Sequence, residues 1–424
     1  MSQLNPQQQE AADALLRFVK DPAERFFIIE GPAGVGKTFL INHFVRNLAN
    51  YSKVVEFLTA NTGKKTKTDF AVQATATTHA AAEKLLIEDS AAQTLHRFLE
   101  LTVQSDYSKG KTQLIPRYGT QGPIDQPMLV IVDEASMIDD LLLRYMHERT
   151  HPETKFVLLG DRAQLVGVSS NKAPVFTKGF PSFSLTIQER QAPNSDLGRL
   201  CLGLRESVIT GVLPQFDLAP GSIEHFSDHN QWLELAKYQM KDPTWTPSAS
   251  RILAWKNQTV IGYNNQIQTA LLGVAHPQVG QQMISNRPVI FNGKMQVKNN
   301  QQVTIMKVCD SMSEGFAGYT IELLVNNTRV IGFMPKDPKA YQKLRRQGLA
   351  IQNQKQVAMA MDSWFDLRPV FASTVDKAQG STYESVFINL RDLAQCRSYD
   401  RVLRMLYTGV SRAQKRVIFF GDLS

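Results

Sequence analysis

The segment with the clearest chemistry is a glycine-rich loop, Gly31 to Thr38, which fits the pattern G-x-x-x-x-G-K-[ST]. Glycines let backbone N–H groups wrap a phosphate chain at the N-terminus of a following helix. We expect Lys37 to reach the β- and γ-phosphates of a nucleotide and the Thr38 hydroxyl to ligate Mg²⁺. The predicted nucleotide contacts of this loop are Gly31, Pro32, Ala33, Gly34, Val35, Gly36, Lys37 and Thr38.

The residues on either side of the loop favour the same interpretation. The segment "RFFIIE" (25–30) is typical of a buried parallel strand, and the segment that begins at Lys37 has the apolar spacing of a helix. The alternative is a chance match in a glycine-rich turn. A strand before the loop and a helix after it argue against that alternative.

A second acidic strand end supplies the metal-binding group that a phosphate loop needs. Five apolar residues, Met128 to Val132, lead directly into Asp133 and Glu134. We expect Asp133 to hold Mg²⁺ through its water shell and Glu134 to polarise the attacking water. An acidic pair at this point could instead cap a helix.

A third strand, "KFVLLG" (155–160), is followed by Asp161 and Gln164, and a polar side chain at Gln164 can sense the γ-phosphate. Parallel strands with chemistry at their carboxyl ends predict a doubly wound α/β nucleotide-binding domain. The residues alone therefore predict an NTPase, without indicating the work that hydrolysis drives.

Composition limits the remaining possibilities. A chain of 424 residues predicts two or three domains, and 43% hydrophobic with 20% charged residues is typical of a soluble globular protein. There is no membrane-length apolar run and no signal-peptide pattern. Cys201, Cys309 and Cys396 lie far apart with no C-x-x-C pair, so neither a disulfide framework nor a zinc cluster is indicated, and a reducing cytoplasm is the simplest location. The net charge of +8 favours a polyanionic partner, although many basic proteins bind no nucleic acid.

The order of the motifs resembles superfamily 1B helicases, the branch that includes RecD and phage Dda-type helicases. The resemblance covers nearly the whole chain. The segments that carry it, from the family's Q motif to motif VI, are "LNPQQQEA", "ATTHAAAEKL", "TLHRFL", "DEASM", "GDRAQL", "LTIQERQ", "ILAWKNQTVIGYNNQI", "STVDKAQGSTYESVFI" and "LYTGVSRAQKRV".

The resemblance implies roles for individual residues. Gln8 is expected to read adenine, Gly380 to contact the nucleotide, and Arg190 and Arg412 to act as arginine fingers beside Lys37, Glu134 and Gln164. The residues expected to contact DNA are Thr78, His79, Thr94, His96, Tyr107, Trp364, Thr374 and Lys377. A lone tryptophan such as Trp364 can equally belong to a core, and Tyr107 can equally be exposed to solvent.

The resemblance also predicts an α/β fold of two RecA-like P-loop domains in tandem. The first is expected over 1–96 and 128–185, and the second over 186–276 and 369–424. A small hairpin, 97–127, interrupts the first domain and is either the pin that splits duplex DNA or a plain surface hairpin. An SH3-like β-barrel with a helical segment, 277–368, interrupts the second.

The expected activity is ATP- and Mg²⁺-dependent unwinding of DNA by 5′-to-3′ movement along a single strand. The expected partners are single-stranded and forked DNA, with single-strand-binding or replication proteins as further candidates, and a monomer as the active form. Replication or recombination in a bacterial or phage-infected cell is the implied setting. The alternatives are a DNA-stimulated ATPase that loads or remodels without separating strands, and a phosphotransferase with an unrelated C-terminal domain.

Two segments depart from the family pattern. Motif V usually has His where this chain has Asp376, and we expect that carboxylate to pair with a neighbouring basic residue such as Lys377. The segment "NTGKKTKTDFAV", which includes the basic loop 61–70, is longer than usual.

Overall fold

The computed structural model describes residues 4–59, 71–87, 90–106, 111–117, 124–167, 173–187, 195–291, 294–337, 339–340, 343–344, 360 and 362–423. Three features predicted from the sequence lie outside these ranges, namely Arg190, Tyr107 and the basic loop 61–70.

The first part of the chain forms a six-stranded sheet in which all neighbouring strands are parallel. Its central strands are the three apolar segments recognised in the sequence. In order across the sheet the strands are β10 (Ser182–Ser184), β1 (Phe26–Glu30), β9 (Lys155–Gly160), β8 (Met128–Asp133), β2 (Ala71–Ala76) and β5 (Gln93–Thr94). Alternate residues of β1 belong to two different core clusters, because successive side chains of a strand point to opposite faces.

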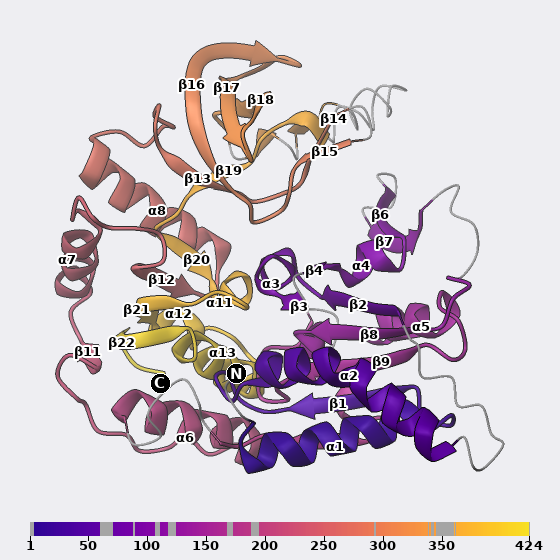
Figure 1. The fold of residues 1–424 in the computed structure, drawn as a ribbon. Helices are drawn as coiled ribbons and strands as arrows, with labels where there is room; N and C mark the ends of the chain where they lie inside the picture. Colours follow the sequence, from indigo (N-terminus) through magenta and orange to yellow (C-terminus); the bar gives the residue numbers. More distant parts are fainter. Residues whose placement is uncertain are drawn as a thin grey trace.

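Helices cover both faces of this sheet (Figure 1). Leu15 of α1 and Phe44 of α2 pack in one core cluster, and Met146 of α5 packs in the other. The helices and short elements of this region are α1 (Pro6–Lys20), α2 (Lys37–Thr59), α3 (His79–Lys84), β3 (Leu86–Ile87), β4 (Ser90–Ala91), α4 (Leu95–Phe98), η1 (Ala135–Met137), α5 (Asp140–Glu148) and η2 (Pro174–Phe176).

A second parallel sheet lies beside the first (Figure 1). Its strands in order are β11 (Ile223–Phe226), β22 (Ala413–Phe420), β21 (Tyr383–Asn389), β12 (Ser250–Ala254) and β20 (Ala372–Thr374). Its helices are α6 (Asp196–Thr210), α7 (His229–Met240), α8 (Asn257–Leu272), α11 (Val375–Ala378), α12 (Leu390–Leu393) and α13 (Tyr399–Val410). The predicted α/β fold with parallel sheets is therefore confirmed.

Between α8 and β20 the chain leaves the second sheet and forms an antiparallel five-stranded sheet. We call this region the inserted sheet. Its strands in order are β18 (Thr328–Pro335), β17 (Phe316–Val325), β16 (Gln302–Ser313), β13 (Gln282–Ser285) and β19 (Leu367–Pro369), with a separate ribbon of β14 (Val289–Phe291) and β15 (Lys294–Val297). Figure 1 shows it standing away from both parallel sheets.

A hairpin of β6 (Leu101–Asp106) and β7 (Lys111–Pro116) follows α4 in the first domain. Its base is fixed to that domain: Leu101 is buried, and the Tyr145 hydroxyl donates to the carbonyl oxygen of Leu114 at 3.0 Å. The strands stand on the same side of the molecule as the inserted sheet (Figure 1).

The two parallel sheets share a core. Ala163 and Leu165, which follow β9 of the first sheet, are buried in the cluster that contains Leu406 and Val410 of α13. The loop after β9 is therefore packed against the second domain. Within the described part of the chain, no helix is long and apolar enough to cross a membrane.

Candidate active site

The phosphate loop has the backbone that its glycines permit. Gly34 and Gly36 have φ angles of +89° and +78°, in the left-handed region that favours glycine. A Cβ atom at Gly31 would collide with the carbonyl oxygen of Leu185. The Lys37 ammonium donates to the carbonyl oxygens of Gly31 and Pro32 at 2.6 and 2.9 Å. The lysine therefore lies against its own loop.

The loop opens on a cavity of about 460 Å³ between the two parallel sheets. From the first domain the cavity is lined by Lys37, Thr38, Asp133, Glu134 and Gln164, among others. From the second domain it is lined by Gly380, Thr382 and Arg412. The fold thus brings residues from distant motifs onto one cavity wall and places an arginine of the second domain on the other.

Burial and charge act on the ionisable groups of this cavity. Burial lowers the pKa of Lys37, and the carboxylates of Asp161, Asp133 and Glu134 oppose that shift. Burial and the adjacent Glu134 carboxylate raise the pKa of Asp133 to about 6. A carboxylate held this close to a second acid is ready to bind a cation, because the cation favours its ionised form.

The backbone of Glu134 is held in a special conformation. Its φ and ψ angles are 55° and 46°, in the left-handed region, and the Thr77 hydroxyl donates to its carbonyl oxygen at 2.9 Å. The Glu134 N–H donates to Asp133 Oδ1 at 2.8 Å. These contacts turn the chain sharply after β8, so that both carboxylates line the cavity although they are adjacent in sequence.

The raised pKa of Asp133 predicts a pH dependence. Without nucleotide, protonation of Asp133 stabilises the folded protein. This contribution is complete below about pH 4, the ordinary pKa range of an aspartate, and is lost as the pH rises through about 6. Because Mg²⁺ requires the ionised form, we expect Mg-nucleotide affinity to fall below about pH 6, by at most about tenfold per pH unit. Titrating a fluorescent nucleotide from about pH 5 to about pH 8, with and without Mg²⁺, measures this. Asp133→Asn should abolish the Mg²⁺-dependent change in nucleotide affinity across this pH range. If that variant keeps the change, Asp133 is not the group that binds Mg²⁺.

Arg412 lies at the cavity but is anchored in the second domain. Its side chain is 6% exposed, and the guanidinium donates to the carbonyl oxygens of Thr408 and Ser381 and to the Ser411 hydroxyl. The other expected finger, Arg190, lies outside the described residues.

Gln8 is 2% exposed and links α1 to the phosphate loop. Its Nε2 donates to the carbonyl oxygen of Val35 at 3.3 Å, and its Oε1 accepts from the Asn5 N–H at 3.1 Å as part of a capping box. Adenine recognition by Gln8 stays a prediction, and it would require the amide to share these bonds.

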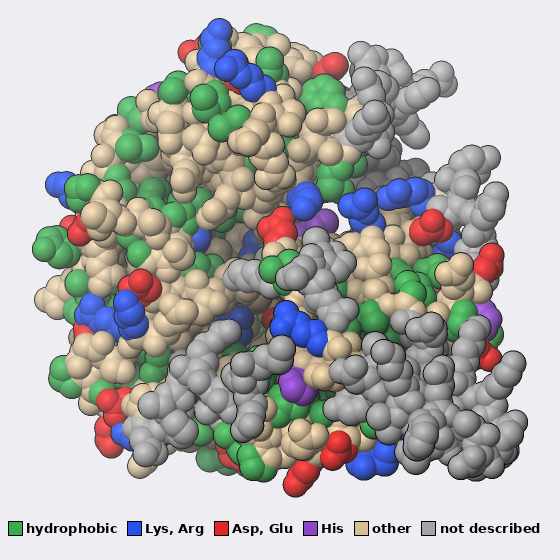
Figure 2. Space-filling view, in the orientation of Figure 1, with side chains coloured by type: hydrophobic (Ala, Val, Ile, Leu, Met, Phe, Trp, Pro, Cys, Tyr) green, Lys and Arg blue, Asp and Glu red, His purple; other side chains and the backbone are tan. Residues whose placement is uncertain are grey.

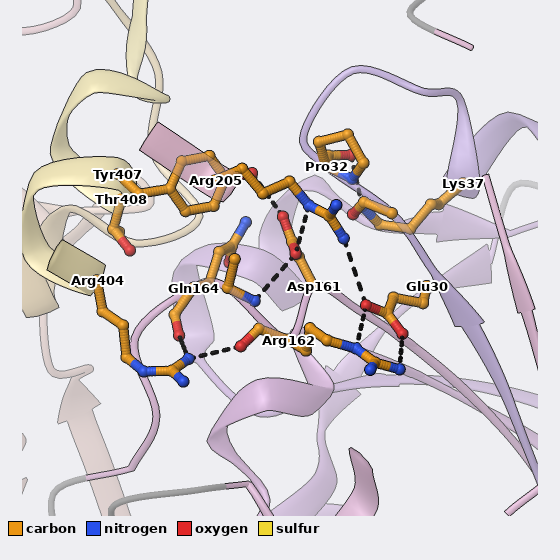
Figure 3. A network of polar contacts seen from close by, with 12 residues as sticks. Glu30, Pro32, Lys37, Asp161, Arg162, Gln164, Arg205, Arg404, Tyr407 and Thr408 are labelled. Carbon is orange, nitrogen blue, oxygen red and sulfur yellow. Dashed lines mark hydrogen bonds and ion pairs between the residues drawn. The ribbon is translucent and has the colours of Figure 1, made fainter. Parts of the chain in front are cut away.

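An ionic network around two buried carboxylates, Glu30 and Asp161, ties the two domains together behind the loop (Figure 3). Glu30, at the end of β1, accepts two 2.6 Å bonds from Arg162. Arg205 of α6 bridges Glu30 and Asp161 at 3.3 and 3.1 Å, and the Tyr407 hydroxyl donates to Asp161 at 2.5 Å. Because the buried carboxylates are paired with charge, this network can hold the domains in register beside the nucleotide cavity.

Arg205 and Tyr407 were not identified from the sequence. The one signal available was Glu30 itself, a charged residue at the end of an otherwise apolar strand. A charge in such a buried place requires a partner, although the sequence does not reveal which one.

The predicted DNA residues of the first domain lie together at the ends of neighbouring strands. β2 and β5 are parallel neighbours, with Ala76 beside Thr94. Thr78 and Thr94 cap α3 and α4, so their hydroxyls are engaged by backbone N–H groups. Burial lowers the pKa values of His79 and His96, so both rings favour the neutral form.

In the second domain, Thr374 and Lys377 line a cavity of about 290 Å³ between that domain and the inserted sheet. Thr374 caps α11, and the Lys377 ammonium donates to Asn286. Asp376 does not pair with Lys377 as predicted. Arg401 of α13 holds it at 2.8 Å, because the helix brings that arginine beside the turn.

The suggestion that Trp364 stacks on a base is wrong for this structure. The side chain is 1% exposed and packs against Phe316 and Phe333. Its indole N–H donates to the Ser313 hydroxyl at 3.2 Å. Trp364 is therefore a core residue of the inserted region, where a large aromatic surface is most stable.

Comparisons with known proteins agree with this arrangement. Residues 3–207 match the AAA domain family, and residues 369–420 match the UvrD-like helicase C-terminal domain. Over 180 residues the chain is 31% identical to the RecBCD enzyme subunit RecD of Haemophilus influenzae, covering 39% of this chain and 26% of that protein. The match therefore spans about a quarter of that relative's length.

Pif1 helicases are among the solved structures to which this chain is similar. A structure of two coordinating Pif1 helicases, concerned with unwinding at forked dsDNA, aligns with a TM-score of 0.52 and 15% identity, covering 99% of this chain and 92% of that one. A Pif1 helicase from Bacteroides in complex with ADP-AlF3 and ssDNA aligns with a TM-score of 0.48 and 14% identity, with the same coverage. The two domain matches and the RecD similarity support the predicted resemblance to superfamily 1B helicases, and the Pif1 structure with a TM-score of 0.52 shows a shared fold.

Proposed function

We propose that this protein is an ATP-dependent DNA helicase that moves 5′ to 3′ along single-stranded DNA and separates duplex strands. The observation that carries the proposal is the cavity between the two parallel sheets. Lys37, Glu134 and Gln164 lie on one wall, and Arg412 lies on the other. A site divided between two domains couples hydrolysis to their relative movement.

Catalysis in such a site depends on positioning and charge. Lys37 leaves its loop carbonyls to contact the β- and γ-phosphates, while Glu134 polarises the attacking water. Arg412 neutralises charge that develops on the γ-phosphate. Because the arginine belongs to the other domain, the cleft closes around ATP and relaxes after hydrolysis, and this cycle moves the DNA.

The donor set fits Mg²⁺. Thr38 and Asp133 would hold it, and the metal would neutralise phosphate charge when bound. Among the described residues no three His, Cys, Asp or Glu side chains cluster to form a complete metal cage. This is the usual situation for Mg²⁺, which takes most of its ligands from nucleotide and water.

The DNA path in this proposal crosses both domains. Thr78, His79, Thr94 and His96 contribute the first half, and Thr374 and Lys377 the second. Figure 2 shows Lys and Arg side chains gathered where the inserted sheet faces the first domain, which supports binding of a polyanion there. We also propose that the parallel sheets are the two RecA-like domains and that the inserted sheet is an SH3-like element.

In the same proposal the β6–β7 hairpin is the wedge that splits the duplex. Replacing residues 104–113 with a short Gly-Ser linker removes the tip but keeps the anchors Leu101 and Leu114. We expect single-strand-stimulated ATPase and translocation to survive and unwinding to be lost, because the hairpin has no part in nucleotide chemistry. Measuring ATPase and forked-duplex unwinding on one preparation separates the outcomes. Equal loss of both would mean that the hairpin supports the fold, and full unwinding would mean that the wedge lies elsewhere.

The decisive test of the proposed function is strand displacement on duplexes that carry either a 5′ or a 3′ tail, with Lys37→Ala as the inactive control. We expect the 5′-tailed substrate to be unwound. Preferential unwinding of the 3′-tailed substrate would overturn the polarity and leave the ATPase assignment intact. Stimulated ATPase without displacement of either substrate would favour the loader or remodeller.

A further inference from the structure

Gln379, a residue of the second domain, reaches across the domain boundary to the predicted base. Its side chain is 2% exposed. Its Nε2 lies 3.2 Å from Glu134 Oε2, 3.2 Å from Ser136 Oγ and 3.3 Å from Gln164 Oε1. One amide therefore contacts both the predicted base and the predicted γ-phosphate sensor.

The hydrogen bonds of this amide are unevenly satisfied. Two N–H groups face three acceptors, so the long bonds are shared, whereas the buried Oε1 has no partner among the described residues. A buried acceptor without a partner costs stability. Exchanging the amide's N and O would not help, because Oε1 would then face the Glu134 carboxylate. The arrangement is poor for stability alone, which indicates a functional constraint on Gln379.

The backbone around Gln379 connects the nucleotide cavity to the predicted DNA contacts. Gln379 ends the short helix α11, which Thr374 caps and which contains Lys377. The next residue, Gly380, approaches Ala81 of α3 in the first domain, and a Cβ added there would be 3.7 Å from the Ala81 Cβ. A displacement of this turn by a bound strand therefore moves the amide that contacts Glu134.

The same turn is joined to the predicted finger. The Arg412 guanidinium donates to the carbonyl oxygen of Ser381 at 3.3 Å. Gln379 and Arg412 are thus carried on one connected part of the second domain: Arg412 lines the cavity, and Gln379 contacts Glu134 and Gln164 of its opposite wall. A movement that places the arginine also places the amide.

We propose that Gln379 is a positioning residue that couples DNA binding to ATP hydrolysis. Its amide orients the Glu134 carboxylate, and a strand bound at Thr374 and Lys377 sets the place of that amide. This inference rests on the proposed function, since it takes DNA as the ligand and Glu134 as the base.

The test compares Gln379→Met, Gln379→Asn and Tyr407→Phe with wild type. Methionine has nearly the length and volume of glutamine without its hydrogen bonds, so packing is kept. Asparagine keeps the amide on a shorter stem. Tyr407→Phe is the matched control, because it removes another hydrogen bond between the domains, to Asp161, without touching Glu134. The kcat and KM of ATPase are measured for each, with and without saturating single-stranded DNA.

We expect Gln379→Met to lower the DNA-stimulated kcat by about tenfold or more, since small displacements of a catalytic group can cost up to about 100-fold. The KM for ATP should change by less than about twofold, because ground-state contacts are retained. The ratio of stimulated to unstimulated turnover should fall, Gln379→Asn should restore part of it, and Tyr407→Phe should keep the wild-type ratio.

A wild-type ratio in Gln379→Met, or an equal fall in Tyr407→Phe, would overturn the inference. A rise of unstimulated turnover in Gln379→Met would also overturn it, because the contact would then restrain the base. If wild-type ATPase ignores DNA, the proposed function fails separately. The positioning of Glu134 is still tested in that case, because Gln379→Met should lower the unstimulated kcat by more than Tyr407→Phe does.

Discussion

Arg412→Ala is expected to lower single-strand-stimulated ATP turnover by about 10³–10⁵-fold, the range that an arginine finger contributes. The guanidinium lines the nucleotide cavity from the second domain, opposite Lys37. Its charge is needed mainly in the transition state, so nucleotide affinity should change little. Stopped-flow turnover and nucleotide titration measure the two quantities separately.

The control for this variant is Arg416→Ala, which removes an arginine from β22, the strand that begins directly after Arg412. Arg416 pairs with Glu224 at 2.5 Å and does not line the nucleotide cavity. It should therefore retain stimulated turnover. Arg412 is buried, so thermal unfolding of both variants must be compared with wild type. Near-normal turnover in a folded Arg412→Ala protein would remove this residue from the site.

Glu134→Gln is expected to stop turnover while ATP still binds, with a loss of about 10²–10⁴-fold, the usual contribution of a general base. The replacement keeps the shape of the side chain and removes only its charge and basicity. Binding should persist because Lys37 and the loop N–H groups are unchanged. Single-turnover hydrolysis at saturating DNA, with equilibrium nucleotide binding on the same sample, tests both parts.

A matched control for this second variant is Glu148→Gln, which makes the same chemical change on the exposed face of α5, where Glu148 pairs only weakly with Arg144 at 3.7 Å. Its turnover should equal wild type. Hydrolysis by Glu134→Gln at the wild-type rate would show that another group activates the water. Loss of nucleotide binding would instead show that Glu134 is needed to shape the cavity.

The parts of the site that could be predicted were those that depend on neighbours in sequence. The phosphate loop requires its glycines at fixed spacing, and Asp133 follows an apolar strand directly. Local spacing is sufficient there because parallel strands place their carboxyl ends at one edge of a sheet. The strands containing Glu30, Asp133 and Gly160 are neighbours in the structure, as this rule predicts.

Other features depended on contacts between segments far apart in the chain. Gln379 and Glu134 are separated by 245 positions, and only the packing of the second domain brings the amide to the carboxylate. Asp376 has a basic neighbour in Lys377, yet Arg401 is its partner because α13 runs beside α11.

The burial of individual side chains was also decided only by the tertiary structure. A charged or aromatic side chain has the same identity in a core and on a surface, so its environment depends on what packs against it. Trp364 could have stacked on a base, but Phe316 and Phe333 enclose it. Glu30 could have been exposed, but it is buried and paired with the half-exposed Arg162 and with Arg205. The residues of the candidate nucleotide site could therefore be predicted from local sequence, whereas the links between the domains arose only when the chain folded.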